Sequence, residues 1–493
     1  MIKPLFKKLT LLSALVLSTV PFVFSQLAAY SPDVLERINK VESSLAGNIR
    51  IEGSPLWTLK ERMDVHGVPG LTVGVISGFK LEWAKAYGMA NKEQNVPATP
   101  ATLFQAASIS KSLNSMGVLK LVQDKKIDLH KDINTYLKSW KFPYDTVSKG
   151  KTISVYNLLT HTAGLTVHGF PGYEVGDTLP TVPQILNGKK PANTAAVRSQ
   201  FEPGLRFQYS GGGTTISQQI VMDVQKQPYD QYMRDHVLQK LGMNASFYTV
   251  PPPPEKQSLL STAYGDDGKP KKGNFHLYPE QAAAALWTNP TDLSKYIIET
   301  QLAYVGKSAK VLNQEMTKLR LTPFPGSEAA LGAFVSTKGN ITYFQHGGAN
   351  EGFRCQYVGT LDNQGNGVVV MVNSDNGEIL QEIINAVSVV YGWTGYYTPQ
   401  MRTLVKVPDN ILSEYAGQYE LSPEFKVTIT KDGDKLRIQP TGQPVSDLFP
   451  ESTTSFFSLI VDAKIEFVRN AGGGIEKLIL HQNGQNIDGK RLP

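Results

Sequence analysis

Cysteine and metal-binding patterns are almost absent from this chain. Cys355 is the single cysteine among 493 residues, so no internal disulfide can form and the fold depends on a hydrophobic core. The eight histidines are scattered, with no HExxH motif and no paired Cys and His residues, which excludes the common zinc sites. We therefore expect no metal and no cofactor, and we interpret Cys355 as a small buried apolar residue.

The chain also has little excess of charge of either sign. The formal net charge is only +6 and no cluster of Lys and Arg occurs, so nothing indicates a nucleic-acid partner. After the first 25 residues the chain has no stretch of 18 or more apolar residues, which predicts a mature protein without a stable membrane insertion. Repeats and low-complexity tracts are not found.

The N-terminal segment differs from the rest of the chain. Three lysines precede an uncharged apolar run at residues 9–24, a pattern typical of a secretory signal peptide. A membrane anchor is the weaker alternative, because Pro21 interrupts the run and it is shorter than the ~20 residues of a spanning helix. We expect residues 1–25 to be removed, which lowers the formal charge from +6 to +3, and the mature protein to be periplasmic or secreted.

The remaining chain is too long for one ordinary core, and its patterns follow the order strands, helices, strands, helix. This order predicts an α+β fold for residues 35–400, in which an antiparallel sheet from both chain ends is flanked by helices and carries a helical insertion. The strands are expected at 71–76, 81–87, 329–336, 341–345, 353–361 and 367–372, and the helices at 155–159, 214–224, 229–241, 291–302 and 379–391.

The tail has a different character. From residue 407 to residue 493, short apolar segments alternate regularly with turns such as Asp432-Gly433-Asp434. Such spacing predicts a small all-β domain. It contains no recognisable catalytic pattern.

The chemistry starts from the pattern Ser-x-x-Lys, in which a helical turn brings a serine hydroxyl beside a lysine amine. Three copies occur, beginning at Ser77, Ser108 and Ser148. Only Ser108 is expected at the start of a helix, where backbone N–H groups can stabilise an oxyanion. A serine needs a positioned base to act as a nucleophile, and Lys111 is placed to supply it.

Further motifs follow Ser108 in a fixed order. They are the Lys125–Leu129 stretch, Leu158–Leu165, Pro203-Gly204, Tyr209-Ser210-Gly211 and His346-Gly347-Gly348. In this order they resemble the serine β-lactamase-related family, nearest its class C β-lactamase and D-aminopeptidase/esterase branch, over residues 55–395. The resemblance implies a β-lactamase/transpeptidase-like fold, and the tail looks like the small β-barrel-like domain often appended to such hydrolases.

The resemblance also implies roles for the motif residues. Ser108 would attack a carbonyl carbon, and Lys111 would either accept its proton or hold Tyr209 as a phenolate that does so; the sequence leaves this choice open. His346 would line the cleft on a strand edge. Gly348 would allow the substrate to approach that strand, and the N–H of Ala349 would complete the oxyanion hole with that of Ser108.

Two departures from the lactamase pattern affect the expected substrate. The second motif usually reads Tyr-x-Asn, but Gly211 stands at the asparagine position, and His346 replaces the usual lysine. We therefore expect β-lactams to be poor substrates. His161, within the Leu158–Leu165 stretch, is interpreted as a packing residue.

These patterns predict an exported serine hydrolase that forms an acyl-enzyme with ester or amide substrates, including D-amino-acid peptides. The alternatives are a β-lactamase or penicillin-binding protein, and a non-catalytic relative that binds peptidoglycan. An α/β-hydrolase is excluded, because no Gly-x-Ser-x-Gly motif is present. The partner is a small-molecule or peptide substrate, and the oligomeric state stays open.

Overall fold

The structure is a computed structural model that describes residues 30–443 and 445–493. The signal peptide expected at residues 1–25 lies outside the described residues. None of the helices described is long and apolar enough to cross a membrane.

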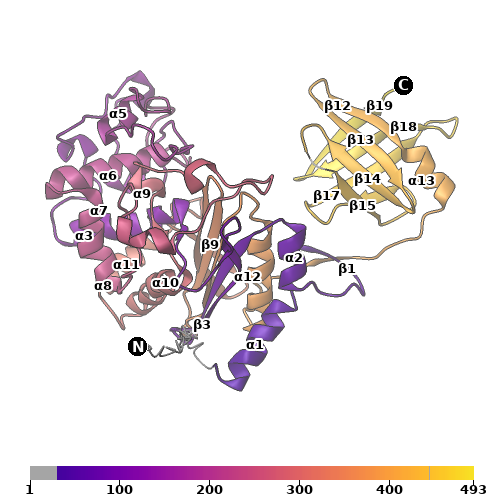
Figure 1. The fold of residues 1–493 in the computed structure, drawn as a ribbon. Coiled ribbons are helices and arrows are strands. Elements are labelled where there is room, and N and C mark those ends of the chain that lie inside the picture. Colours follow the sequence, from indigo (N-terminus) through magenta and orange to yellow (C-terminus); the bar gives the residue numbers. More distant parts are fainter. Residues whose placement is uncertain (1–29, 444) are drawn as a thin grey trace, which may run out of the picture.

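A seven-stranded antiparallel sheet forms the centre of the larger lobe (Figure 1). Its order is β4-β3-β2-β10-β9-β8-β7. The pairing of β10 with β2, in which Val370 lies opposite Val73, joins the strands from the two ends of this part of the chain. The mixed fold, with one sheet built from both chain ends, is therefore confirmed. The strands are β2 (Gly70–Ser77), β3 (Lys80–Asn91), β4 (Val96–Pro97), β7 (Phe334–Lys338), β8 (Ile341–Asn350), β9 (Phe353–Thr360) and β10 (Gly367–Val372).

Helices cover both faces of this sheet, which explains why β2 and β10 are apolar runs rather than alternating patterns. One face packs on α1 (Pro32–Glu42), α2 (Leu59–Val65) and α12 (Glu378–Val390). The other face packs on α10 (Pro290–Tyr304), beyond which the helical insertion lies (Figure 1).

The insertion surrounds α3 (Ser110–Gln123), a helix whose residues are buried on nearly every side. A 3-10 turn, Ala107–Ile109, precedes it, so the helical segment expected near Ser108 begins as this tighter turn. Among the helices around it, α6 (Gly211–Gln225), α7 (Tyr229–Met233), α9 (Gln281–Ala284) and α11 (Gln314–Arg320) contact α3 directly. The insertion also contains α4 (Val155–Leu159), α5 (Val182–Asn187) and α8 (Gln239–Leu241).

One strand expected from the sequence begins later than predicted. Residues 329–333 are apolar, but they form a loop, and β7 starts only at Phe334. The loop packs against α3: Gly332 has a φ of +79°, and a Cβ there would lie 2.5 Å from the Cβ of Ser115. Burial against α3, not strand pairing, explains the apolar character of this segment.

The C-terminal segment is a closed barrel of eight strands, which confirms the expected small all-β domain. Tyr415, at the end of α13 (Asp409–Tyr415), lies inside the barrel core with its ring stacked 4.0 Å from that of Phe467. Before the barrel, β11 (Gln400–Arg402) pairs in parallel with β1 (Ile49–Ile51). The barrel strands are β12 (Gly417–Ser422), β13 (Phe425–Asp432), β14 (Lys435–Pro440), β15 (Ser446–Pro450), β16 (Ser455–Phe457), β17 (Ala463–Arg469), β18 (Ile475–Gln482) and β19 (Gln485–Arg491).

Candidate active site

Ser108 lies in the 3-10 turn directly before α3 and lines a cleft of about 570 Å³. The preceding residue, Ala107, has a φ of +47°, in the left-handed region that residues with a side chain rarely adopt. Strain of this kind persists only where the surroundings enforce it. Here the neighbouring N–H of Ala106 is bonded to the carbonyl of Leu286 at 2.7 Å.

Lys111 lies one turn after Ser108 and its side chain is buried. Its Nζ donates to Ser108 Oγ at 2.9 Å and to the carbonyl of Ala283, in α9, at 2.8 Å. Among the residues that the structure describes, no carboxylate forms an ion pair with this amine. The amine is therefore held against the serine by one backbone carbonyl.

The other two Ser-x-x-Lys copies have no such geometry. Ser77 and Lys80 lie at the tip of the β2–β3 hairpin. The hydroxyl of Ser148 donates to the carbonyl of Asp145, while Lys151 pairs with Glu202. Only Ser108 has a buried amine bonded to its hydroxyl.

Tyr209 lies just before Ser210, the N-cap of α6, and lines the same cleft. The Nζ of Lys111 lies 5.0 Å from the centre of its ring. Within the described part of the chain, its hydroxyl makes no hydrogen bond to another residue. Its backbone carbonyl accepts a hydrogen bond from Nδ1 of His168 at 2.6 Å.

His346 lies on β8, with its ring 6.3 Å from that of Tyr209. Its Nδ1 contacts the carbonyl of Gly347 at 2.6 Å, and since a carbonyl only accepts, the neutral ring carries its proton on Nδ1. Burial, and next the charge of Lys111, lower the pKa of His346 to about 4. His346 is thus neutral at pH 7 and has a free lone pair on Nε2.

Packing against the turn that carries Ser108 requires a glycine at position 348. A Cβ at this position would lie 2.3 Å from the carbonyl oxygen of Ala106 and 2.5 Å from Sγ of Cys355. The glycine therefore lets β8 approach the turn that carries Ser108. Gly348 also lines the cleft, and its role in admitting substrate stays a prediction. Ala349 lies next along β8 and lines the cleft, as does Gly347.

Gly211 is also tightly surrounded. A Cβ there would lie 2.8 Å from the ring of Phe170 and 3.3 Å from the carbonyl oxygen of His168. The space that an asparagine side chain would need is thus filled by the loop between α4 and α5. The replacement of the usual asparagine by Gly211 thus goes together with a loop that packs directly against this position.

His161 is the residue that the sequence interpretation placed outside the site and that the structure places beside it. Its buried ring lies on the ring of Tyr209, with centroids 4.4 Å apart. Burial and the nearby charge of Lys111 hold the pKa of His161 well below its usual value. The sequence carried no signal for this contact, because a single histidine in a loop has many ordinary uses.

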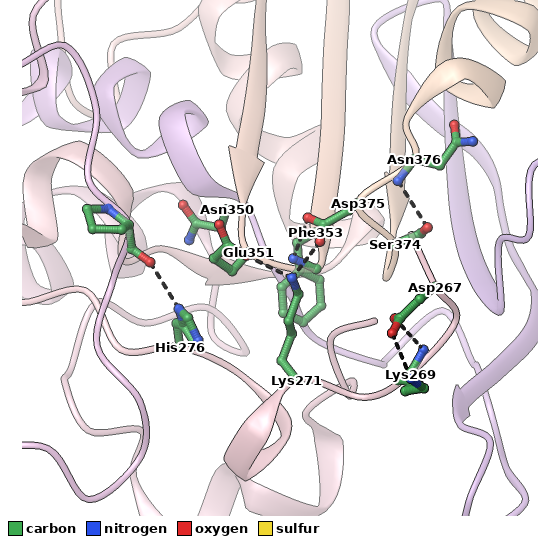
Figure 2. A network of polar contacts seen from close by, with 12 residues as sticks. Asp267, Lys269, Lys271, His276, Asn350, Glu351, Phe353, Ser374, Asp375 and Asn376 are labelled. Atoms are coloured by element: carbon green, nitrogen blue, oxygen red, sulfur yellow. Dashed lines mark hydrogen bonds and ion pairs between the residues drawn. The ribbon is translucent and has the colours of Figure 1, made fainter. Parts of the chain in front are cut away.

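The lining of the cleft also includes charged residues. Arg354, Asp375 and Glu378 line it, and Arg354 pairs with Asp375 at 3.0 Å. Figure 2 shows Lys271 between Asp375 and Glu351, with its Nζ 2.7 Å and 2.8 Å from their carboxylates. Burial opposes ionisation of Asp375, but Lys271, the N–H of Gly352 and Arg354 together hold its pKa below the usual value. This network connects Arg354 and Asp375 of the cleft lining to Lys271 and Glu351.

A second cavity contains none of the candidate catalytic residues. A cavity of about 650 Å³ beside α2 is lined by residues such as Thr58, Lys60 and Tyr87, and contains none of the candidate residues. No group of three or more metal-ligating side chains is found in residues 30–443 and 445–493.

A buried lysine bonded to a serine at a helix start is typical of Ser-x-x-Lys acyl-transfer enzymes. Tyr209 and His346 line the same cleft as Ser108. The family comparison agrees. Residues 58–387 match the model described as Beta-lactamase, and the chain belongs to this family, whose members are serine hydrolases. Residues 401–491 match a domain of unknown function, DUF3471.

Curated relatives are distant. Protein flp of Staphylococcus aureus (strain MW2) is 23% identical over 330 residues, which cover 64% of this chain and 62% of that protein. A Beta-lactamase of Pseudomonas fluorescens is 28% identical over 240 residues, which cover 49% of this chain and 62% of that protein. The chain thus spans 62% of the length of both relatives.

Solved structures share the fold. The octameric penicillin-binding protein homologue from Pyrococcus abyssi superposes with a TM-score of 0.60 at 20% identity, covering 88% of this chain and 98% of that one. The D-amino acid amidase from Ochrobactrum anthropi SV3 gives 0.57 at 20% identity, covering 73% and 99%. At such identities the likeness concerns the fold alone.

Proposed function

We propose that this protein is a serine hydrolase that cleaves ester or amide substrates through an acyl-enzyme on Ser108. The observation that carries the proposal is the bond of 2.9 Å between Ser108 Oγ and the buried Nζ of Lys111. A serine hydroxyl held against a buried amine is activated for attack, whereas a serine that only caps a helix needs no such partner.

In the proposed reaction, Ser108 Oγ attacks the carbonyl carbon while its proton passes to Lys111, or to Tyr209 held as a phenolate beside Lys111. The N–H groups of Ser108 and Ala349 receive the developing oxyanion. The proton then moves to the leaving alcohol or amine as the carbonyl–leaving-group bond breaks. Water attacks the ester on Ser108 by the same route in reverse, which releases the acid and restores the serine.

His346 supports this scheme as a neutral cleft residue. Its Nε2 lone pair can accept a hydrogen bond from a substrate N–H or from a phenol, and it adds no positive charge to the site. The lysine that lactamases usually have at this position would bind the carboxylate of a β-lactam. We therefore propose esters and D-amino-acid amides or peptides as the substrate class, with β-lactams as poor substrates.

A second candidate is a β-lactamase or penicillin-binding protein, favoured by the family match over residues 58–387. The filled space at Gly211 argues against efficient lactam turnover. A non-catalytic, peptidoglycan-binding role is the remaining alternative. The patterns at residues 1–25 further lead us to propose export to the periplasm or beyond. We also propose that residues 35–400 and 407–493 form the two domains of the mature protein.

The test is covalent labelling with a fluorophosphonate, followed by a hydrolysis panel. Wild type should be labelled at Ser108, Ser108→Ala should not, and Ser77→Ala, the matched change in another Ser-x-x-Lys copy, should be labelled as wild type. Of a p-nitrophenyl ester, a D-alanyl amide and a chromogenic cephalosporin, the ester should be cleaved fastest and the cephalosporin slowest. The absence of a Ser108-dependent adduct would overturn the hydrolase proposal, and fast cephalosporin turnover would favour the second candidate.

A further inference from the structure

His161 contacts three consecutive residues at the candidate base. Its carbonyl oxygen accepts the N–H of Gln208 at 2.7 Å, and its Nδ1 accepts the N–H of Ser210 at 3.2 Å. Between these two bonds its ring lies on that of Tyr209, with centroids 4.4 Å apart and planes inclined by 33°. One residue thus holds the backbone on both sides of Tyr209 and one face of its ring.

The backbone of His161 is set in an unusual conformation to make these contacts. Its φ is +55°, in the left-handed region, which His, Asn and Asp tolerate better than other residues with a side chain. The next residue, Thr162, donates its N–H to the carbonyl of Asn157 at 2.9 Å, which ties the turn to α4. Simple packing of a histidine would require neither this conformation nor an acceptor at Nδ1.

The charge state of His161 is also defined by its contacts. Because Nδ1 accepts an N–H, the neutral ring carries its proton on Nε2, the opposite arrangement to His346. Both rings are buried, and the lowered pKa values keep both neutral at pH 7. The two histidines beside Tyr209 therefore leave Lys111 as the amine whose charge acts on the phenol.

We propose that His161 is a positioning residue for Tyr209, holding the phenol ring beside Lys111 so that its oxygen stays within reach of Ser108 during proton transfer. The inference rests on the proposed acyl-enzyme mechanism, in which Tyr209 takes part in moving the serine proton. His161 acts through Tyr209 and does not itself contact the reacting atoms.

Two substitutions separate the contacts of His161. His161→Phe keeps an aromatic ring against Tyr209 but removes the acceptor for the N–H of Ser210. His161→Asn places Oδ1 near the position of Nδ1 and tolerates a positive φ, but removes the ring contact. The matched controls are His236→Phe and His236→Asn, because His236 lies on Tyr232 with nearly the same geometry, 4.6 Å and 32°, outside the cleft.

The measurements are kcat and KM for p-nitrophenyl butyrate, the fluorophosphonate labelling rate and the pH dependence of kcat, each normalised to the folded fraction. We expect both His161 variants to lower kcat and the labelling rate by about 10- to 100-fold, since small misplacements of a catalytic group have effects of this size. KM should stay within about twofold, and the rising limb of kcat against pH should move to higher pH by about half a unit or more. The His236 variants should match wild type.

A double variant makes the test specific. If His161 acts through Tyr209, then His161→Phe should lower kcat by less than about twofold in a Tyr209→Phe background, because coupled residues are not additive. If His161→Phe lowered kcat in the Tyr209→Phe background by as much as in wild type, the inference would be overturned. His161 variants with a lower melting temperature but a wild-type kcat and pH profile would also overturn it. Wild type that is not labelled at Ser108 would instead refute the proposed function itself.

Discussion

Lys111 Nζ lies 2.9 Å from Ser108 Oγ, and the lysine side chain that carries it is almost fully buried, at 4% exposure for the residue. Its second contact is the carbonyl of Ala283. A buried amine without a carboxylate partner is costly to keep in its charged form. A fold keeps such a group where chemistry requires it, so Lys111 should contribute to activity and not to stability.

Lys111→Met separates these two quantities. Methionine has a similar length and removes the amine, so the free energy of unfolding should stay unchanged or rise by about 1 kcal/mol, as when a buried ionic group is replaced by an apolar one. Labelling of Ser108 and ester hydrolysis should fall by at least about 10³-fold, because the serine loses its activating partner.

Urea unfolding and fluorophosphonate labelling measure the two effects. Lys120→Met is the control on the same helix, where the lysine pairs with Asp124 near the surface. A Lys111→Met protein that retained more than about a tenth of wild-type labelling would contradict the assigned role.

Much of the fold could be predicted because burial leaves a clear pattern. β10 was expected at residues 367–372 and is found there, since a short run of β-branched residues between turns is typical of a strand covered on both faces. The same reasoning failed at residues 329–333, whose apolar side chains pack in a loop under α3. In the barrel, β19 leaves no apolar pattern in the sequence, because polar residues dominate it.

The site was predictable in part. The order of motifs indicated that Ser108, Tyr209 and His346 belong together, although the turn before α3, the start of α6 and β8 are far apart in sequence. The place of His161 depends on a φ of +55°, which no composition or spacing reveals. Its contact with Tyr209 therefore required the structure.

Gly211→Asn tests whether the lactamase-type asparagine can be accommodated. Its Cβ would lie 2.8 Å from the ring of Phe170, so we expect the free energy of unfolding to fall by about 1–3 kcal/mol, as for overpacked cores. Cephalosporin hydrolysis should not increase. Thermal unfolding and a chromogenic cephalosporin assay measure the two outcomes.

A compensating change provides the control for this substitution. Gly211→Asn combined with Phe170→Ala should recover part of the stability, because the second change removes the colliding ring. Full stability of Gly211→Asn alone would show that the loop between α4 and α5, which carries Phe170, moves freely, contrary to the packing described.

The buried His346 should make the protein less stable in acid. Its pKa is lowered to about 4 in the folded state, by burial and then by Lys111, against about 6.5 when unfolded. Between these values the unfolded chain binds more protons, so the free energy of unfolding rises with pH from 4 to 6.5. From pH 7 to pH 5 the histidine should cost on the order of 2 kcal/mol.

Replacing His346 should remove its part of the stability loss at acid pH. His346→Gln should lose less stability than wild type between pH 7 and pH 5, measured by urea unfolding at several pH values. His130→Gln, a change at an exposed histidine, should keep the wild-type slope. Parallel slopes for wild type and His346→Gln would mean that the buried ring does not resist protonation.

Glu280, at the start of α9, should have the opposite dependence on pH. It is fully buried, and neither carboxyl oxygen has a hydrogen-bond partner among the described residues. Burial raises its pKa to about 8, so the folded protein holds a proton that the unfolded chain releases near pH 4.5. Stability is therefore present at acid pH and lost as the pH rises from 4.5 to 8, by about 3 kcal/mol between pH 5 and pH 8. Glu280→Gln, which has no proton to lose, should flatten this decline, whereas Glu315→Gln, at an exposed position of α11, should not. A Glu280→Gln protein that declined as steeply as wild type in urea unfolding would refute the assignment of a neutral buried acid.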